Sequence, residues 1–220
     1  MRDAIALARD LSHASSTVLA HNWTAMVHQH RRDPQRTRQH AEAAIALAEE
    51  ELAPWLAWAT MLRGWAMAMQ GEGEEGIAQL RRGLAGWTAG GLACLQPYFL
   101  SLLSEAHATI AQTDVALSTV AEALAITHQT HEGYAEAELY RLRGELQGDP
   151  EEREVSFRQA IDIARRQSAK SFELRAVTSL RRLDLEQSER TASRQMLSEI
   201  YGWFTEGFDS VDLKEAGALI

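Results

Sequence analysis

Apolar residues recur along the chain at the spacing of amphipathic helices, in stretches of about 16 residues. Turn-forming residues separate the stretches, at Pro34, Pro54, 71–73, 90–91, Gly133 and 149–150. The pattern predicts helices over 2–11, 15–30, 35–51, 54–70, 73–88, 92–111, 114–129, 132–147, 151–168, 170–186 and 190–205, with a short last helix over 209–218. The chain is therefore expected to be all-α.

A short phrase, a small residue followed by an aliphatic one, recurs about every 40 residues. Its copies begin at Ala4, Ala44, Gly83, Ala123 and Ala160, with a weaker sixth copy at Met196. A second phrase places a small residue at Gly64, Ser104 and Gly144. Two helices and two turns fill such a period, so the repeat predicts an α-solenoid of antiparallel helical hairpins. The small residues are expected where neighbouring helices approach closely.

Residues 1–220 are expected to form a single domain, because no linker or low-complexity segment interrupts the repeats. The helices over 2–11 and 35–51 are expected to be second helices of their hairpins. The chain would then begin in the middle of a repeat, which suggests a fragment of a longer array. Because solenoids need covered ends, we expect residues 201–220 to form a C-terminal cap.

Composition and charge exclude several classes of protein. With 22 basic and 31 acidic residues the formal charge is −9, which argues against nucleic-acid binding, since that requires a basic face. No membrane span is expected, because the most apolar stretch, 54–69, is short and contains Arg63. Neither the acidic start of the chain nor the single Cys94 suits a secreted protein. We therefore expect a cytoplasmic location.

Several runs of residues in the C-terminal half are specific enough to indicate a protein family. They are AELYRLRGEL over 137–146, FRQAI over 157–161, ARRQ over 164–167, AKSFELRA over 169–176 and the closing YGWFTEGFDSVDLKEA over 201–216. These runs resemble the C-terminal tetratricopeptide-repeat (TPR) region of bacterial multidomain proteins that join a class III adenylate or guanylate cyclase domain to a predicted ATPase domain. Similar tails occur on ATPase-type transcriptional regulators. The match covers residues 134–216, with Val211 where the family often has proline, and the first 130 residues agree only in periodicity.

The resemblance implies a TPR-like right-handed superhelix with repeats longer than the usual unit of about 34 residues. It also implies a regulatory array rather than an enzyme, because the sequence contains no glycine-rich phosphate loop ending in Lys-Ser or Lys-Thr and no recognisable cyclase aspartate pair. No cofactor is expected. The implied partners are a protein or peptide, or the upstream domains of the same protein.

Patterns of histidine, cysteine and carboxylate predict neither catalytic residues nor a metal site. His128 and His131 lack further ligands nearby, whereas zinc requires three or four. Cys94 lies among apolar residues and is expected to be a buried thiol. The glutamate-rich runs over 49–51, 72–75 and 151–152 are expected to be solvated helix faces and first-turn charges.

The tryptophans allow two interpretations. Trp58 and Trp65 are seven residues apart and share one helix face with Met61. This stripe is either core between hairpins or part of a binding groove, because in TPR arrays the first helix of each hairpin lines the concave surface. The groove hypothesis has four residues: Trp58, Trp65, Trp23 and Tyr98.

The aromatic residues of the closing run are expected to cover the last hairpin. Trp203, Phe204 and Phe208 would fold back on it, Gly207 would end the helix, and Asp209 would cap the next one. On that interpretation Trp203→Ala opens a core cavity and costs about 3–5 kcal/mol.

Three functions remain open on the sequence. The first is a non-catalytic interaction and regulatory scaffold of a bacterial signalling protein, in which occupancy of the groove shifts the activity of attached domains. The second is a small-molecule sensor domain of an ATPase-type transcriptional regulator. The third, an independent enzyme, has no supporting motif. Pairing of uncovered hairpin faces in a homodimer is a further hypothesis.

Overall fold

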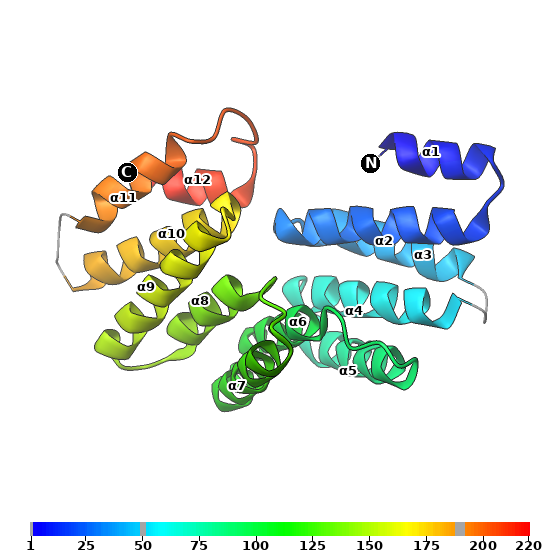
Figure 1. The fold of residues 1–220 in the computed structure, drawn as a ribbon, viewed down its shortest axis with the longest axis horizontal. Coiled ribbons are helices and arrows are strands. Elements are labelled where there is room, and N and C mark those ends of the chain that lie inside the picture. Colours follow the sequence, from blue (N-terminus) through cyan, green and yellow to red (C-terminus); the bar gives the residue numbers. More distant parts are fainter. Residues whose placement is uncertain (1, 49–51, 188–191) are drawn as a thin grey trace. The chain divides into compact units, whose positions relative to one another are not determined.

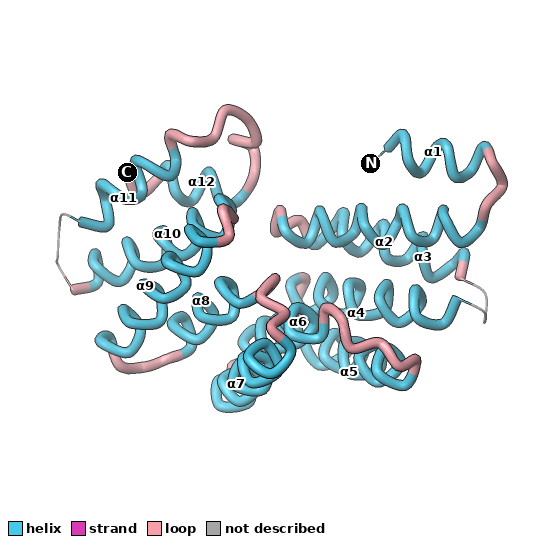
Figure 2. The backbone as a smooth tube through the Cα atoms, in the orientation of Figure 1, coloured by secondary structure: helices cyan, strands magenta, loops and turns pink. Residues whose placement is uncertain are grey.

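The computed structural model describes residues 2–48, 52–187 and 192–220, except for the side chains of Arg2 and Asp3. Helices joined by loops make up the described chain, with no strand among these residues (Figure 2). Along the sequence they are α1 (Arg2–Asp10), α2 (Ala14–His30), α3 (Pro34–Leu47), α4 (Ala53–Met69), α5 (Gly73–Ala89), α6 (Gln96–Thr109), α7 (Thr113–Thr130), α8 (Glu136–Leu146), α9 (Pro150–Arg166), α10 (Lys170–Glu186), α11 (Ala192–Tyr201) and α12 (Val211–Gly217). The predicted all-α class is confirmed.

The chain divides into two compact units, residues 1–112 and 113–220 (Figure 1). In the first unit α2 pairs with α3 and α4 with α5, while α4 also packs against α2 and α6. In the second unit α8 pairs with α9 and α10 with α11, while α10 also packs against α8 and α12. Within each unit, therefore, the first helices of successive hairpins stack on one another. A single domain over residues 1–220 remains a prediction.

Side-chain caps and left-handed residues set several helix ends. The carboxylate of Asp33 accepts a hydrogen bond from the backbone N–H of Arg36 at 3.0 Å, and Pro34 follows it in the first turn of α3. Asp149 caps α9 in the same way. Gly71 and Gly91, with φ of 94° and 75°, turn the chain after α4 and α5.

Small residues allow α4 and α5 to approach each other closely. A Cβ atom on Gly64 would lie 2.7 Å from the carbonyl oxygen of Gly76, and one on Gly83 would lie 2.7 Å from that of Ala57. Both contacts are to backbone, so a larger side chain would force the helices apart. The prediction that small residues mark close approaches is confirmed here, and at Gly144, where a Cβ would overlap the ring of Phe157.

Some helices are shorter than the sequence pattern predicts. The helix expected over 92–111 begins at Gln96, because Leu95 before it is left-handed, with φ of 60°. The helix expected over 190–205 ends at Tyr201, and the short last helix begins at Val211. The expected end of the helix over 35–51, the glutamate run 49–51 and the start at 190 lie outside the described residues. Apolar periodicity marks helix interiors, but it does not fix their ends.

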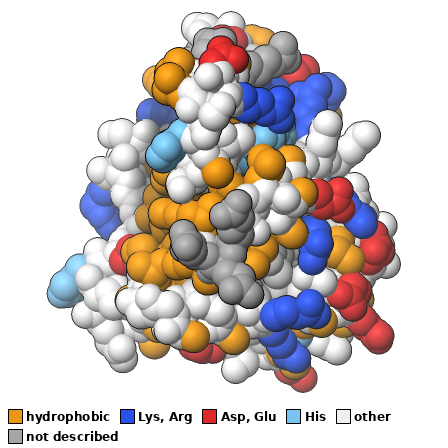
Figure 3. All heavy atoms as spheres, turned by 90° about the vertical axis from the view of Figure 1, so that its right-hand side faces the viewer, with side chains coloured by type: hydrophobic (Ala, Val, Ile, Leu, Met, Phe, Trp, Pro, Cys, Tyr) orange, Lys and Arg blue, Asp and Glu red, His pale blue; other side chains and the backbone are white. Residues whose placement is uncertain are grey.

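One end of the first unit carries a partly exposed apolar face. Figure 3 shows hydrophobic side chains gathered on this side of the molecule, where α3 ends and α4 begins. Ile45, Leu52 and Trp55 are partly buried there and pack against a buried cluster that includes Val18 and Ala44. The core of this unit therefore extends to the surface at this end.

Candidate functional site

The tryptophan stripe of α4 lies in the core of the first unit. Trp58 and Trp65 are each 2% exposed. The Trp58 ring meets Trp87 of α5 edge-on at 6.1 Å between centroids, and Phe99 of α6 at 6.4 Å. Because neighbouring helices pack against α4, Trp58 is covered by aromatic rings and Trp65 is equally buried.

The polar atoms of Trp65 and Tyr98 form hydrogen bonds with neighbouring helices of this core. The indole N–H of Trp65 donates to Glu105 Oε2 at 2.7 Å, which joins α4 to α6. The Tyr98 hydroxyl donates to Gln29 Oε1 at 2.9 Å, which joins α6 to α2. Tyr98 is also only 2% exposed. These bonds hold α2 and α6 close together beside α4.

Trp23 differs from the other three residues of the groove hypothesis. It is 44% exposed and packs edge-on against Trp58, with 4.9 Å between ring centroids. The structure therefore brings Trp23 and Trp58 together but leaves only Trp23 open to solvent among the four. The groove role of Trp58, Trp65, Trp23 and Tyr98 remains a prediction, and a ligand could touch Trp23 without any change in packing.

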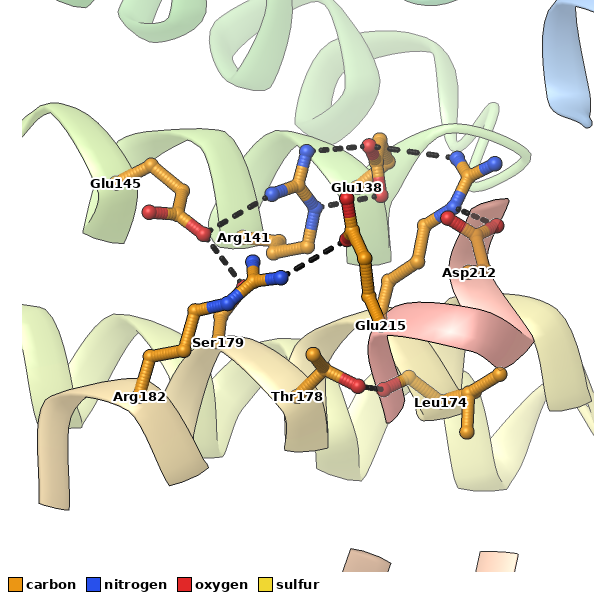
Figure 4. Close-up of polar contacts among 10 residues, drawn as sticks. Glu138, Arg141, Glu145, Leu174, Thr178, Ser179, Arg182, Asp212 and Glu215 are labelled. Carbon is orange, nitrogen blue, oxygen red and sulfur yellow. Dashed lines mark hydrogen bonds and ion pairs between the residues drawn. The ribbon is translucent and has the colours of Figure 1, made fainter. Parts of the chain in front are cut away.

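The stacked helices of the second unit carry charged side chains instead, from α8, α10 and α12 (Figure 4). On α8, Arg141 binds Glu138 Oε1 through Nη2 at 2.7 Å and Glu145 Oε1 through Nη1 at 3.2 Å. Ser179 of α10 donates its hydroxyl to the same Glu145 oxygen at 2.6 Å. The carboxylates of α8 therefore connect to α10 by hydrogen bonds rather than by apolar contact.

Arg175 of α10 links three helices. Its Nε donates to Asp212 Oδ2 of α12 at 2.7 Å, and its Nη1 lies 3.6 Å from Glu138 Oε1 of α8. The residue is only 8% exposed. Burial alone would lower the pKa of Arg175, but the charges of Glu138 and Asp212 outweigh it and hold the pKa above its ordinary value. The guanidinium is thus a fixed positive charge that positions α12.

The outer part of this charged network reaches the surface. Arg182 of α10 pairs with Glu215 of α12 at 2.9 Å, and both side chains are partly exposed. A partner could compete for these two side chains, whereas Arg175 and Asp212 are shielded. The network therefore has a structural interior and a surface edge capable of polar recognition.

The repeat register relates the two sets of residues. Arg175 and Asp212 are 37 residues apart, and Glu138 stands the same distance before Arg175. In the first unit, Trp58 and Tyr98 are 40 residues apart, and Glu138 stands 40 residues after Tyr98. Equivalent positions of the first helices thus carry aromatic rings in one unit and charges in the other. The 37-residue spacing of Glu138, Arg175 and Asp212 is the sequence signal of this network, and no single local motif contains it.

Two of the three closing aromatic residues do not bury themselves on the last hairpin as expected. Trp203 is 58% exposed and Phe208 is 47% exposed. Because α11 already ends at Tyr201, these side chains belong to a loop, and the left-handed Gly207 lies within that loop instead of ending a helix. The expected core role of Trp203 is therefore wrong. The short helix α12 contacts both α10 and α11 and buries Leu213 and Ala216.

The side chain of Cys94 is exposed, so the prediction of a buried thiol is wrong. It lies in the loop before α6, where its backbone carbonyl accepts a hydrogen bond from the indole N–H of Trp87 at 2.8 Å. Within the described ranges, no group of three or more His, Cys, Asp or Glu residues could hold a metal ion. No helix in the same ranges is long and apolar enough to cross a membrane.

Comparison with known proteins supports the fold. No protein-family model matches the sequence, and no curated protein matches it. Two crystal structures of the TPR-like repeats of a kinesin light chain-like protein from Podosopora anserina, one with a single substitution, are similar at TM-scores of 0.56 and 0.55. Each is 18% identical, covering 86% of this chain and 95% of the other. The chain therefore has an all-α fold of TPR-like helical repeats.

Proposed function

We propose that the chain is a non-catalytic scaffold that binds a protein or peptide and regulates a bacterial signalling protein. The observation that carries the proposal is the stack of first helices, which in TPR-like arrays forms the recognition surface. In the first unit the exposed Trp23 of α2 offers an apolar anchor. In the second unit, considered by itself, Arg182 and Glu215 offer polar contacts.

The sequence resemblance supports a more specific version of this proposal. Residues 134–216 resemble the C-terminal region of cyclase–ATPase proteins, so the array would act on domains attached to it. In that case the array binds the upstream domains of the same protein, and it regulates them by changing the fraction that is in the active conformation. We place the protein in the cytoplasm, which its single cysteine supports, because disulfides are rare there.

An immunoblot of the source cells with an antibody to this array tests the parent protein. A band far above 24.5 kDa is expected. Cyclase and ATPase rates should then change when the array is deleted from that parent. A band at the size of this chain, or unchanged rates, would contradict the regulatory role.

Thermal shift assays separate the scaffold from the small-molecule sensor. A metabolite that binds the folded chain raises its Tm at fixed protein concentration, whereas a protein-docking array does not respond to metabolites. We expect no response to a panel of nucleotides and metabolites. Turnover of a nucleotide or an ester by the isolated chain would overturn the non-catalytic assignment.

A further inference from the structure

Three histidines meet between α2 and α3 in the first hairpin. Nδ1 of His21 lies 3.1 Å from Nδ1 of His40. The His40 ring also stacks on that of His28, with 5.6 Å between centroids and 5° between planes. His21 is buried, and the other two rings are partly buried. The packing of α2 on α3 therefore includes three groups that titrate near neutral pH.

The hydrogen bonds of this cluster require neutral rings. The Nη2 group of Arg9 in α1 lies 3.5 Å from Nε2 of His21, and arginine can only donate. His21 then carries its proton on Nδ1 and donates it to Nδ1 of His40, an assignment made from the network. A second proton on His21 would face Arg9, and one on Nδ1 of His40 would face the N–H of His21. Either protonation removes a hydrogen bond and leaves two donors opposed.

The charged groups around the cluster are mostly positive. Arg9 comes from α1, Arg31 from the end of α2 and Arg36 from α3. The acidic neighbour is Asp33, 4.0 Å from Nδ1 of His28, but its carboxylate also caps α3 and lies 3.5 Å from Nε of Arg36. The single charged residue of α4, Arg63, is bound to Gln79 of α5. A protonated ring would thus add to existing positive charge.

The pKa directions agree with this geometry. Burial first, and then His40 and Arg9, lower the pKa of His21 from the ordinary 6.5. Burial and Arg36 lower that of His40. For His28, burial and the nearby cations outweigh Asp33, so its pKa is lowered as well. In each case the folded protein favours the uncharged ring.

We propose that His21, His28 and His40 form an acid-sensitive switch that loosens the packing of α1, α2 and α3 when their rings become charged. The described contacts of α1 are with α2, and Arg9 of α1 lies directly on the cluster. Loss of the neutral hydrogen-bond chain therefore frees α1 and separates α2 from α3. This inference stands on the packing of the first hairpin and does not depend on the proposed function.

The direction of the pH effect follows from linkage. When a group's folded pKa lies below its unfolded value, its stabilisation is complete above the unfolded value, here 6.5, and is lost as pH falls through the folded pKa. The first hairpin is thus expected to be stably packed at pH 7.5 and to open in mildly acidic solution. His128 and His131 of the second unit are exposed and provide internal controls.

Hydrogen exchange with the full chain tests the switch, using rates corrected for the intrinsic effect of pH. Between pH 7.5 and pH 5.5 we expect exchange in α1–α3 to rise at least about tenfold. At pH 5.5 a histidine with the ordinary pKa of 6.5 is protonated about ten to one in the unfolded form, whereas the folded form disfavours the charged rings. Exchange in α8–α10 should change less than about twofold over the same range. An equal rise in both units, or none, would overturn the proposal.

Matched variants separate titration of the cluster from general acid sensitivity. His40→Gln keeps a hydrogen-bonding side chain that does not titrate, so it should reduce the acid-induced rise in α1–α3 to less than about threefold. His131→Gln should behave as the unmodified chain. If His40→Gln fails to fold at pH 7.5, an NMR titration of the histidine rings in the unmodified chain decides the matter. Rings of His21 and His40 that titrate at or above 6.5 would refute the switch.

Discussion

The stacked first helices of the two units occupy the same place in the repeat but use opposite chemistry. In the first unit, Trp58 of α4 is buried among rings from neighbouring helices, and Trp65 of the same helix is buried as well. In the second, Glu138 of α8 forms ion pairs with Arg141 of the same helix and with Arg175 of α10. One backbone frame therefore accepts either an aromatic core or a charged network between its first helices.

The aromatic and the charged contacts contribute differently to stability and to recognition. Apolar burial is non-directional and stabilises by about 25 cal/mol per Å² of buried surface, so the aromatic unit gains free energy while hiding its side chains. Buried ion pairs gain little net free energy, but they fix which groups must face each other. The partly exposed Arg182 and Glu215 continue such pairs to the surface. The charged unit is thus better suited to recognising a partner.

Trp58→Ala should have the largest effect, because it removes the central ring of the aromatic unit. We expect it to lower the free energy of unfolding by about 3–5 kcal/mol through the cavity it leaves. Among the residues that the structure describes, the indole N–H of Trp58 finds no hydrogen-bond partner, so the loss would be one of packing. Urea denaturation followed by circular dichroism measures the effect.

Trp203→Ala is the matched control, since it deletes the same side chain from an exposed loop. Its effect should stay within about 0.5 kcal/mol. Equal losses in the two variants would contradict the placement of these two tryptophans.

Arg175→Ala should disrupt the charged unit. It leaves Asp212 shielded without its arginine, and the expected loss is about 3 kcal/mol. Glu138 retains Arg141, which limits the damage on α8. The double variant Arg175→Met/Asp212→Leu should recover most of the loss, because apolar packing can replace a buried pair. No recovery would indicate that the charges themselves are required for the fold.

Arg182→Ala tests the surface edge of the same network. Because Arg182 and Glu215 are both partly exposed, its removal should change the free energy of unfolding by less than about 1 kcal/mol. Salt should weaken the pair further, so the difference between this variant and the unmodified chain is expected to shrink at 1 M NaCl. A loss as large as that of Arg175→Ala would place this pair in the interior.

Acid titration should distinguish the units more finely. Burial would raise the pKa of Glu173 in α10, but hydrogen bonds from Arg165 and Lys170 outweigh it, so the pKa lies below 4.5. Its stabilisation is present above 4.5 and is lost as pH falls through the folded value. The second unit should therefore loosen at lower pH than the first. In hydrogen exchange, Glu173→Gln should lessen the loosening of α10 below pH 4.5, while Glu122→Gln, an exposed position on α7, should not.

Particular residues show which parts of the site the sequence could predict. The exposed Trp23 was among the four groove residues, yet its apolar neighbours on α4 turned out to be enclosed. The spacing of Trp58 and Trp65 places them on one helix face, but it does not determine which other helices pack against that face. The Arg175 ion pairs join residues 37 positions apart, and no local motif marks them.

The sequence by itself determined the helical hairpins, their repeat and the close approach of α4 to α5 at Gly64 and Gly83, because these follow from local periodicity and side-chain size. Tertiary structure alone decided that Trp58 is buried while Trp203 and Cys94 are exposed. It also brought His21 and His40 together from two helices. The physical reason is that burial and pairing depend on which elements pack against a face, and that depends on the whole fold.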